Sequence, residues 1–219
     1  NLLDVTTDDL HALPKTMFDD RVKRLKEKSP GKLIIKEYPT ASAHSGHFKA
    51  LLNELALKKS FKPDVLFIDY LNICSSSRFK GGNISSYFYI KAIAEELRGL
   101  AVEFKLPIFT ATQTTRSGFV STDIGLEDTS ESFGLPATAD FMFALMTSEE
   151  LDSLNQMKVK QLKNRYSDPA INRSFIIGVD RSKMRLYDVE QKAQNIVDAN
   201  QEKDIEETDP YDKFSDFKV

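Results

Sequence analysis

Two polar side chains that could do chemistry stand at the ends of two apolar runs. Asp69 follows the apolar residues 65–68, and Gln113 ends the run 107–113. We expect the strand 65–68 to be buried on both faces. An unpaired carboxylate inside such a strand is costly, so we expect Asp69 at the exposed carboxyl end of the strand or beside a cation. Two neighbouring buried strands that each end in one polar group are how an open α/β sheet builds a site.

The chemistry that fits this pair is nucleotide hydrolysis. A carboxylate near a metal ion, with a polar sensor near a γ-phosphate, is the arrangement that nucleotide hydrolases use. The local pattern also fits a second interpretation, in which Asp69 caps a neighbouring loop and Gln113 bonds only to backbone. The residues alone leave both interpretations open.

A short basic motif follows later in the chain. Lys163 and Arg165 flank Asn164 on a predicted hairpin, and Lys158 and Lys160 make the approach to it basic. This motif fits a cationic finger that reaches a phosphate held by a neighbouring subunit. It also fits a solvated edge strand that charge protects from pairing with other strands.

Two predicted loops contain the other basic candidates. Arg78 and Lys80 lie in the Ser- and Gly-rich segment 75–86, and Arg116 lies in the segment 114–129. Basic side chains on such loops could contact nucleic-acid phosphates. Surface loops also contain such residues by chance, so the spacing does not decide between the two interpretations.

A phosphate-binding loop is missing from this set. The Gly-Lys dipeptide occurs at Gly31 and Lys32, but Leu33 follows it, so the motif G-x-x-x-x-G-K-[ST] is not formed. Either the chain is no nucleotide hydrolase, or the phosphate-binding strand and loop lie upstream of Asn1. Because Asn1 is not a start methionine, we expect a fragment of a longer protein.

Histidine and cysteine usage argues against a metal or thiol site. His44 and His47 lie three residues apart without a Cys or further His nearby, so we expect residues of a helix start rather than zinc ligands. Cys74 is the single cysteine, and no base partner is evident, so we expect a packing role. One cysteine excludes an intramolecular disulfide and fits a reducing compartment. No apolar run reaches the roughly 18 residues that a membrane helix needs.

Charge divides the chain into a body and a tail. The 219 residues carry a net charge of −3, and 41% of them are hydrophobic. Residues 191–219 contain eight acidic residues and four lysines, so the body, residues 1–190, has a charge of about +1. We predict one domain over 1–190 and an acidic, flexible tail over 191–219 that could dock on a partner.

Hydrophobic periodicity predicts alternating helices and strands. We expect helical structure over residues 1–28 with Thr7 as N-cap, and an amphipathic helix over 45–59 with Leu57 among its inward residues. The other expected helices are 87–104 and 132–137, and the expected strands are 33–35, 65–69, 106–112, 140–146, 162–166, 175–179 and 185–189. The alternation predicts an α/β fold with a mainly parallel sheet and an antiparallel C-terminal hairpin.

Several short motifs together resemble the DnaB family of replicative DNA helicases. The matching segments, in chain order over residues 1–189, are the Walker B-like strand 66–71, the helix 92–101, the sensor strand 111–113, the D-x-x-E-S…A-D motif at 128–132 and 139–140, and the K-x-R hairpin at 163–165. Members of the family from T-even-type phages share longer runs, at 52–55, 91–98 and 134–142. Each piece is weakly specific, whereas the joint match is strong.

The resemblance implies a RecA-like three-layer sandwich, incomplete at its N-terminal side, in a ring hexamer that moves 5′→3′ on single-stranded DNA. It implies ATP and Mg²⁺ as cofactors, with Asp69 holding Mg²⁺ through water and Gln113 sensing the γ-phosphate. Lys163 and Arg165 would act on the neighbouring subunit's ATP. The loops with Arg78, Lys80 and Arg116 would face the DNA channel. It also implies primase and a helicase loader as partners, and the host cytoplasm as location.

The chain departs from this family in three features. The Walker A loop, the catalytic Glu of the preceding strand and the N-terminal domain are absent. We therefore expect the chain by itself neither to hydrolyse ATP nor to unwind DNA. The alternative is a non-catalytic RecA-like module that binds DNA or scaffolds partners. A RecA-type recombinase is disfavoured by the D-x-x-E-S segment and the K-x-R hairpin.

Overall fold

The fold is described from a computed structural model, which covers residues 2–79, 84–114, 124–126, 134–168 and 171–189. Lys80, Arg116, the motif segment 128–132 and the tail 191–219 lie outside these residues. The chain divides into two compact units. One unit contains Asn1–Lys32, Ala144–Gln161 and Ala170–Val219, and the other contains Leu33–Phe143 and Leu162–Pro169.

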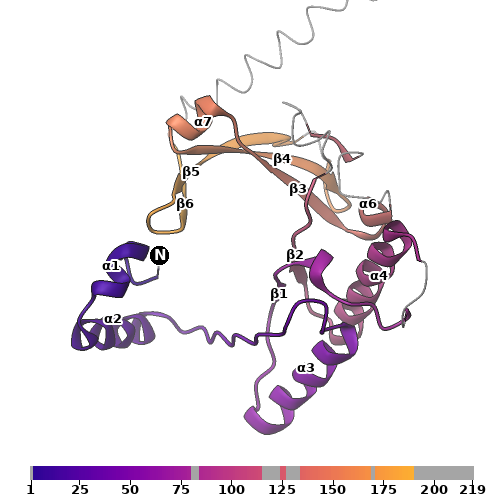
Figure 1. The fold of residues 1–219 in the computed structure, drawn as a ribbon, viewed down its shortest axis with the longest axis horizontal. Helices are drawn as coiled ribbons and strands as arrows, with labels where there is room; N and C mark the ends of the chain where they lie inside the picture. The colour runs from indigo at the N-terminus through magenta and orange to yellow at the C-terminus, as the bar shows by residue number, and fades with distance from the viewer. Residues whose placement is uncertain (1, 80–83, 115–123, 127–133, 169–170, 190–219) are drawn as a thin grey trace, which may run out of the picture. The chain divides into compact units, whose positions relative to one another are not determined.

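Helices alternate with short strands along most of the described chain (Figure 1). The helices are α1 (Thr7–Ala12), α2 (Lys15–Lys28), α3 (Ser45–Lys59), the 3₁₀ helix η1 (Leu71–Ile73), α4 (Ser86–Phe104), α6 (Gly134–Thr138) and α7 (Glu149–Ser153). The strands are β1 (Leu66–Ile68), β2 (Ile108–Thr110), β3 (Phe141–Met146), β4 (Gln156–Asn164), β5 (Ser174–Asp180) and β6 (Arg185–Asp188). β1 and β2 form one sheet, and a second sheet has the order β3-β4-β5-β6.

A parallel β1–α4–β2 crossover forms the centre of the second unit. β1 pairs with β2 in parallel, with Ile68 opposite Thr110. Parallel neighbours require a crossover connection, and α4 supplies it. The inward face of α4 is apolar and buried, at Ile90, Ile93, Leu97 and Leu100 among others, and packs in the same core as Phe48 and Leu52 of α3. Figure 1 shows α3 and α4 side by side. The prediction of a βαβ unit here is confirmed.

The β1–β2 pair is covered on one face. Leu66, Ile68 and Ile108 face the core, whereas Phe67 and Phe109 alternate to the other face. Those two rings stack with centroids 5.3 Å apart and stay 70% and 49% exposed. The expectation that both faces of β1 are buried is wrong for the described residues, because α3 and α4 pack on one side of the pair.

The helix α3 has the predicted bounds, and its start depends on histidine. The His44 Nδ1 accepts a bond from the Gly46 backbone N–H at 3.0 Å, and the His47 Nδ1 accepts one from the His44 N–H at 3.2 Å. A Cβ on Gly46 would lie 2.8 Å from the His44 ring, so a larger residue there would displace the ring that caps the helix. The helix-start role of both histidines is confirmed. Leu57 was expected inward, but it is 85% exposed, because it lies on the solvent side of the helix.

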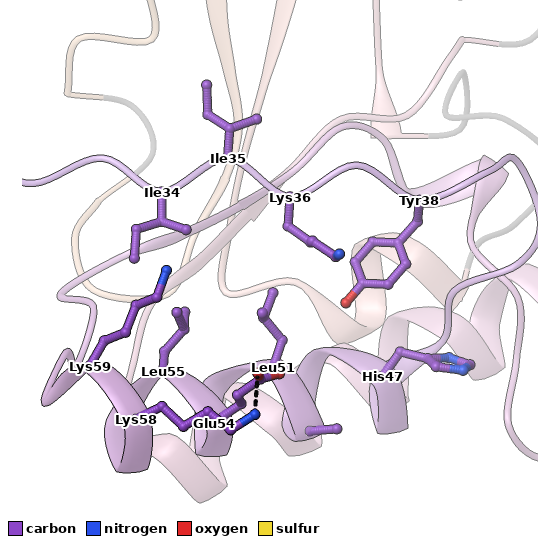
Figure 2. Close-up of a pocket in the computed structure, with 11 residues that line it drawn as sticks. Ile34, Ile35, Lys36, Tyr38, His47, Leu51, Glu54, Leu55, Lys58 and Lys59 are labelled. Carbon is purple, nitrogen blue, oxygen red and sulfur yellow. Dashed lines mark hydrogen bonds and ion pairs between the residues drawn. The ribbon is translucent and has the colours of Figure 1, made fainter.

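The predicted strand 33–35 is not a strand. Leu33 and Ile35 are 74% and 83% exposed, and the segment runs as extended chain above α3 (Figure 2). Ile34 points toward α3, which leaves a groove of about 380 Å³ lined by Leu51, Leu55 and three lysines of both segments. A strand needs a backbone partner. This segment packs its apolar side chain on a helix instead, which the apolar sequence pattern cannot distinguish.

The N-terminal helical stretch is divided in two. Thr6 caps α1, because its Oγ1 accepts a bond from the Asp9 N–H at 3.1 Å, so the prediction of Thr7 as N-cap is wrong by one residue. Pro14 separates α1 from α2. A proline disfavours helical backbone in the residue before it, so Leu13 ends the first helix.

The C-terminal strands form antiparallel pairs. β4 pairs with β5 from Gln156–Gly178 to Lys160–Ser174, and β5 pairs with β6. The predicted hairpin is therefore confirmed, but its first strand starts at Gln156 rather than at residue 162. Met157 and Val159 alternate with Lys158 and Lys160, a pattern typical of a half-buried strand. The structure departs from that pattern at Lys160, which is buried like its neighbour Val159.

One carboxylate of α4 organises the start of the 75–86 segment. The Glu96 side chain accepts bonds from the hydroxyls of Ser45 (2.8 Å), Ser76 (2.5 Å) and Ser77 (2.7 Å), and from the Ser77 N–H (3.0 Å). Partial burial opposes its ionisation, but these hydrogen bonds outweigh burial and lower the pKa of Glu96 to about 2. Glu96 therefore ties α3, α4 and the segment after η1 together as a carboxylate.

Substitution of Glu96 should destabilise this unit. Glu96→Ala leaves several partly buried donors without an acceptor, so we expect the free energy of unfolding to fall by about 2 kcal/mol. The matched control is Glu103→Ala on the same helix, which removes an ion pair with Lys49 whose side chains are both 49% exposed. That loss should stay below about 1 kcal/mol. Urea denaturation of the chain, followed by circular dichroism, measures both, and equal losses would contradict the role of Glu96.

The stabilisation by Glu96 should depend on pH. Its pKa is near 4.5 when unfolded and about 2 when folded, so the stabilisation is complete above pH 4.5 and is lost as the pH falls through 2. We expect the stability difference between the unsubstituted chain and Glu96→Gln to be constant near neutral pH and to shrink progressively below about pH 4.5. Urea denaturation across this range measures it. A difference that does not change with pH would show that the charge of Glu96 contributes nothing.

Candidate functional site

The carboxyl ends of β1 and β2 remain bonded beyond the strands. The Leu71 N–H donates to the Ala111 carbonyl at 3.1 Å, and the Thr112 hydroxyl donates to the Asn72 Oδ1 at 2.8 Å. These bonds fix the two chain segments that follow the strands side by side. Because the strands are parallel, both segments leave the same edge of the sheet.

Asp69 and Gln113 both lie at this edge. Each is exposed, and a cis peptide bond joins Asp69 to Tyr70. The Gln113 Nε2 donates to the Tyr70 hydroxyl at 3.4 Å. The structure therefore places the two predicted residues at one edge of the sheet, where Gln113 contacts the residue that follows Asp69.

The edge suits a magnesium ion better than a zinc ion. Within the described part of the chain, no three His, Cys, Asp or Glu side chains form a group that could hold a metal. Mg²⁺ keeps most of its waters and is commonly held by one or two carboxylates together with substrate phosphates, so a lone carboxylate such as Asp69 fits it. Cys74 is buried, burial raises its thiol pKa, and its Sγ lies 3.6 Å from the Tyr70 carbonyl, in agreement with a packing role.

Lys163 and Arg165 share one face of the chain at the end of β4, since residues two apart on a strand point the same way. Both reach the C-terminal turn of α6. The Lys163 Nζ donates to the Pro136 carbonyl, and the Arg165 Nη2 donates to the Ala137 carbonyl at 2.8 Å. Burial, followed by the charge of Arg165, lowers the pKa of Lys163.

Asp140 binds Arg165 together with a second arginine. Its Oδ1 accepts from the Arg98 Nη1 at 2.7 Å and from the Arg165 Nη1 at 3.1 Å. The hydrogen bond from Arg98 is the largest cause that lowers the pKa of Asp140, and it outweighs desolvation. Asp140 is therefore an ionised anchor between α4 and the end of β4.

Of the three residues predicted to contact nucleic acid, the structure describes Arg78. Its Nη1 lies 2.5 Å from the Glu95 Oε2, with the two side chains 49% and 37% exposed. Lys91 lies 3.9 Å from the other oxygen of Glu95. The guanidinium of Arg78 is thus already neutralised by its own chain. Lys80 and Arg116 lie outside the described residues.

The predicted residues form two clusters. Among the described residues, no hydrogen bond or ion pair joins Asp69 or Gln113 to Lys163 or Arg165. The groove of Figure 2 contains none of the four. Each cluster therefore has its own hydrogen-bond partners among the described residues.

Three residues with clear contacts were not among the predicted site residues. Asp140 and Glu95 each pair with a predicted cation, Arg165 and Arg78 respectively, and Arg98 pairs with Asp140. Asp140 had the same signal as Asp69, because it is a lone carboxylate beside an apolar strand. Arg98 and Glu95 lie three apart on a helix, and nothing in that spacing indicates that Arg98 meets Asp140 or that Glu95 meets Arg78.

Comparison with known proteins finds one related sequence and similar solved folds. Over 194 residues the chain is 42% identical to a DnaB-like replicative helicase of Enterobacteria phage T4. The aligned residues make up 87% of this chain and 41% of that protein. The chain thus spans about two fifths of that relative's length. No protein-family model matches the sequence.

Solved structures give the same answer for the fold. One solved ATPase domain has a TM-score of 0.69, at 16% identity over 86% of this chain and 67% of that chain. A solved DnaB-like replicative helicase, described with its interactions with primase, matches with a TM-score of 0.68 and 17% sequence identity. The match covers 86% of this chain and 47% of that chain. The RecA-like α/β fold and the resemblance to the DnaB family are confirmed. No helix in the described part of the chain has the length and apolarity to cross a bilayer.

Proposed function

From this DnaB-like character we propose that the chain is part of the motor domain of an ATP-dependent replicative DNA helicase. The main support is the parallel β1–β2 pair, which brings Asp69 and Gln113 to one sheet edge. It occurs within a sequence 42% identical to a DnaB-like replicative helicase. An edge of this kind is where open α/β sheets bind ligands.

The proposed cofactors are ATP and Mg²⁺. Asp69 would hold the ion through a bound water, and Gln113 would contact the γ-phosphate. When bound, the ion would neutralise charge that develops on the phosphates. The contact between Gln113 and Tyr70 supports this role for Gln113, because a sensor amide must be held near the carboxylate.

The proposed site is shared between subunits of a ring hexamer. Lys163 and Arg165 would approach the ATP of the neighbouring subunit, where Arg165 stabilises negative charge in the transition state. The support is that these two cations belong to a cluster separate from Asp69 and Gln113, while their side chains share one face.

The proposed track is single-stranded DNA, with translocation 5′→3′. Arg78, Lys80 and Arg116 would follow its phosphate backbone from the loops 75–86 and 114–127. A solved neighbour was described with its interactions with primase, which supports primase as a partner. We also propose a helicase loader as a second protein partner and the host cytoplasm as the location.

The alternative function, a non-catalytic RecA-like module, is favoured by one observation. The 219 residues contain no G-x-x-x-x-G-K-[ST] motif. We therefore propose that the chain by itself lacks ATPase and unwinding activity, and that turnover requires a phosphate-binding segment in the same polypeptide. The module and the motor make opposite predictions for the natural full-length protein.

ATPase assays distinguish these functions. We expect the 219-residue chain to show no turnover with or without single-stranded DNA, and the natural full-length protein to turn over ATP. Asp69→Ala should reduce that turnover on the order of 100-fold or more, because the ion loses its protein partner. Asp152→Asn, which removes a carboxylate from a surface pair with Arg181, is the matched control and should retain activity. Turnover by the 219-residue chain that Asp69→Ala abolishes would refute the requirement, and an inactive full-length protein would favour the module.

DNA binding tests the neutralisation of Arg78. In the full-length protein, Arg78→Ala should weaken single-stranded DNA binding and reduce the salt dependence by about one ion, because one phosphate contact is lost. Glu95→Gln should strengthen binding a few-fold, since phosphate no longer competes with a carboxylate for Arg78. Glu54→Gln, which removes an equal charge from the exposed pair with Lys58, is the control. Fluorescence anisotropy at several salt concentrations measures this, and equal effects of Glu95→Gln and Glu54→Gln would contradict it.

A further inference from the structure

Three consecutive carbonyls at the end of α6 each accept a bond from a different cation. Pro136 accepts from Lys163, Ala137 accepts from Arg165 at 2.8 Å, and the Thr138 carbonyl accepts from the Arg98 Nη1 at 2.7 Å. The last carbonyls of a helix have no partner inside the helix, and cations near them are favoured. The C-terminal turn of α6 is thus a fixed set of acceptors for these three side chains.

Asp140, two residues after α6, binds Arg165 through both the backbone and the side chain of the arginine. The Arg165 backbone N–H donates to the Asp140 carbonyl at 3.0 Å, and the Arg165 Nη1 donates to the Asp140 Oδ1 at 3.1 Å. Both the start and the tip of the arginine are therefore tied to one residue. Such a double attachment restricts the rotamers of a long side chain that otherwise has many.

Arg98 fastens Asp140 in turn. Its Nη1 bonds both the Asp140 Oδ1 and the Thr138 carbonyl, so it bridges the carboxylate to the end of α6. Arg98 belongs to α4, the crossover helix between β1 and β2. The helix that holds Asp140, and through it Arg165, is therefore the same helix that connects β1 to β2.

These bonds orient the guanidinium of Arg165 and leave some of its N–H donors available. They employ two of its five N–H groups, and 44% of its side chain remains exposed. A cation held in this way can meet a phosphate without first losing rotamer freedom, which is how a prepared site lowers a barrier.

We propose that Asp140 and Arg98 are positioning residues that set Arg165 for the phosphate of a neighbouring subunit's nucleotide. The proposal rests on the proposed function, because it takes Arg165 as the residue that contacts the nucleotide. Asp140 and Arg98 act through Arg165 and touch no phosphate themselves. Their removal should therefore change the rate of turnover rather than the binding of ATP.

A double-mutant cycle on the natural full-length protein tests this proposal. Arg165→Ala should lower kcat on the order of 1,000-fold, and Asp140→Asn should lower kcat about 10- to 100-fold with KM nearly unchanged, because a displaced guanidinium is a misplaced catalytic group. In the Arg165→Ala protein, Asp140→Asn should lower kcat less than about twofold, since its target is already gone. Asp152→Asn, another Asp paired with an arginine, serves as the control.

Each outcome decides a point. Equal losses from Asp140→Asn with and without Arg165, or a gain in turnover, would overturn the positioning role; a gain would indicate a restraint on Arg165 instead. Full activity of Arg165→Ala would overturn the proposed finger and the positioning role together. If Asp140→Asn fails to fold by thermal melting, Arg98→Met replaces it, and its loss of kcat should likewise vanish without Arg165.

Discussion

The parallel pairing of β1 with β2 is the constraint on which the rest of the unit containing Leu33–Phe143 depends. Parallel neighbours cannot be joined by a tight turn, so α4 must cross from one to the other and bury Ile93 and Leu97 against them. This arrangement places the chain after each strand at one edge, where Asp69 and Gln113 emerge. The geometry of the proposed nucleotide site is thus a consequence of strand direction, before any side-chain contact forms.

The polar side of α4 organises the charged residues. Glu96 gathers the serines at the start of the 75–86 segment, Glu95 pairs with Arg78, and Arg98 braces Asp140. One stretch of a buried helix therefore touches the base of the proposed DNA loop and the support of the proposed finger. Each of the proposed functional cations among the described residues, Arg78, Lys163 and Arg165, has an acceptor in its own chain. A phosphate would therefore have to bind beside that acceptor or replace it.

Sequence reasoning succeeded where a local pattern determines structure. The apolar face of α3 and the βαβ alternation predicted their elements, and parallel direction placed Asp69 beside Gln113. It failed where the structure of a segment depends on the part of the chain that packs against it. An apolar run at 33–35 needs a neighbouring strand to become one, Phe67 needs a second covering layer to be buried, and Leu57 was assigned to the wrong side of its helix. The bond between Arg98 and Asp140 joins positions far apart in the chain, so no local spacing could indicate it.

The decisive experiment is a structure of the natural full-length protein with Mg²⁺ and a non-hydrolysable ATP analogue. We expect Arg165 to contact a phosphate of the nucleotide beside the neighbouring subunit's Asp69. We also expect Arg165 to keep its bonds to Asp140 and to the Ala137 carbonyl in that state. An Arg165 that lies away from every nucleotide, or that reaches the phosphate only after leaving Asp140, would refute the proposed role of Asp140.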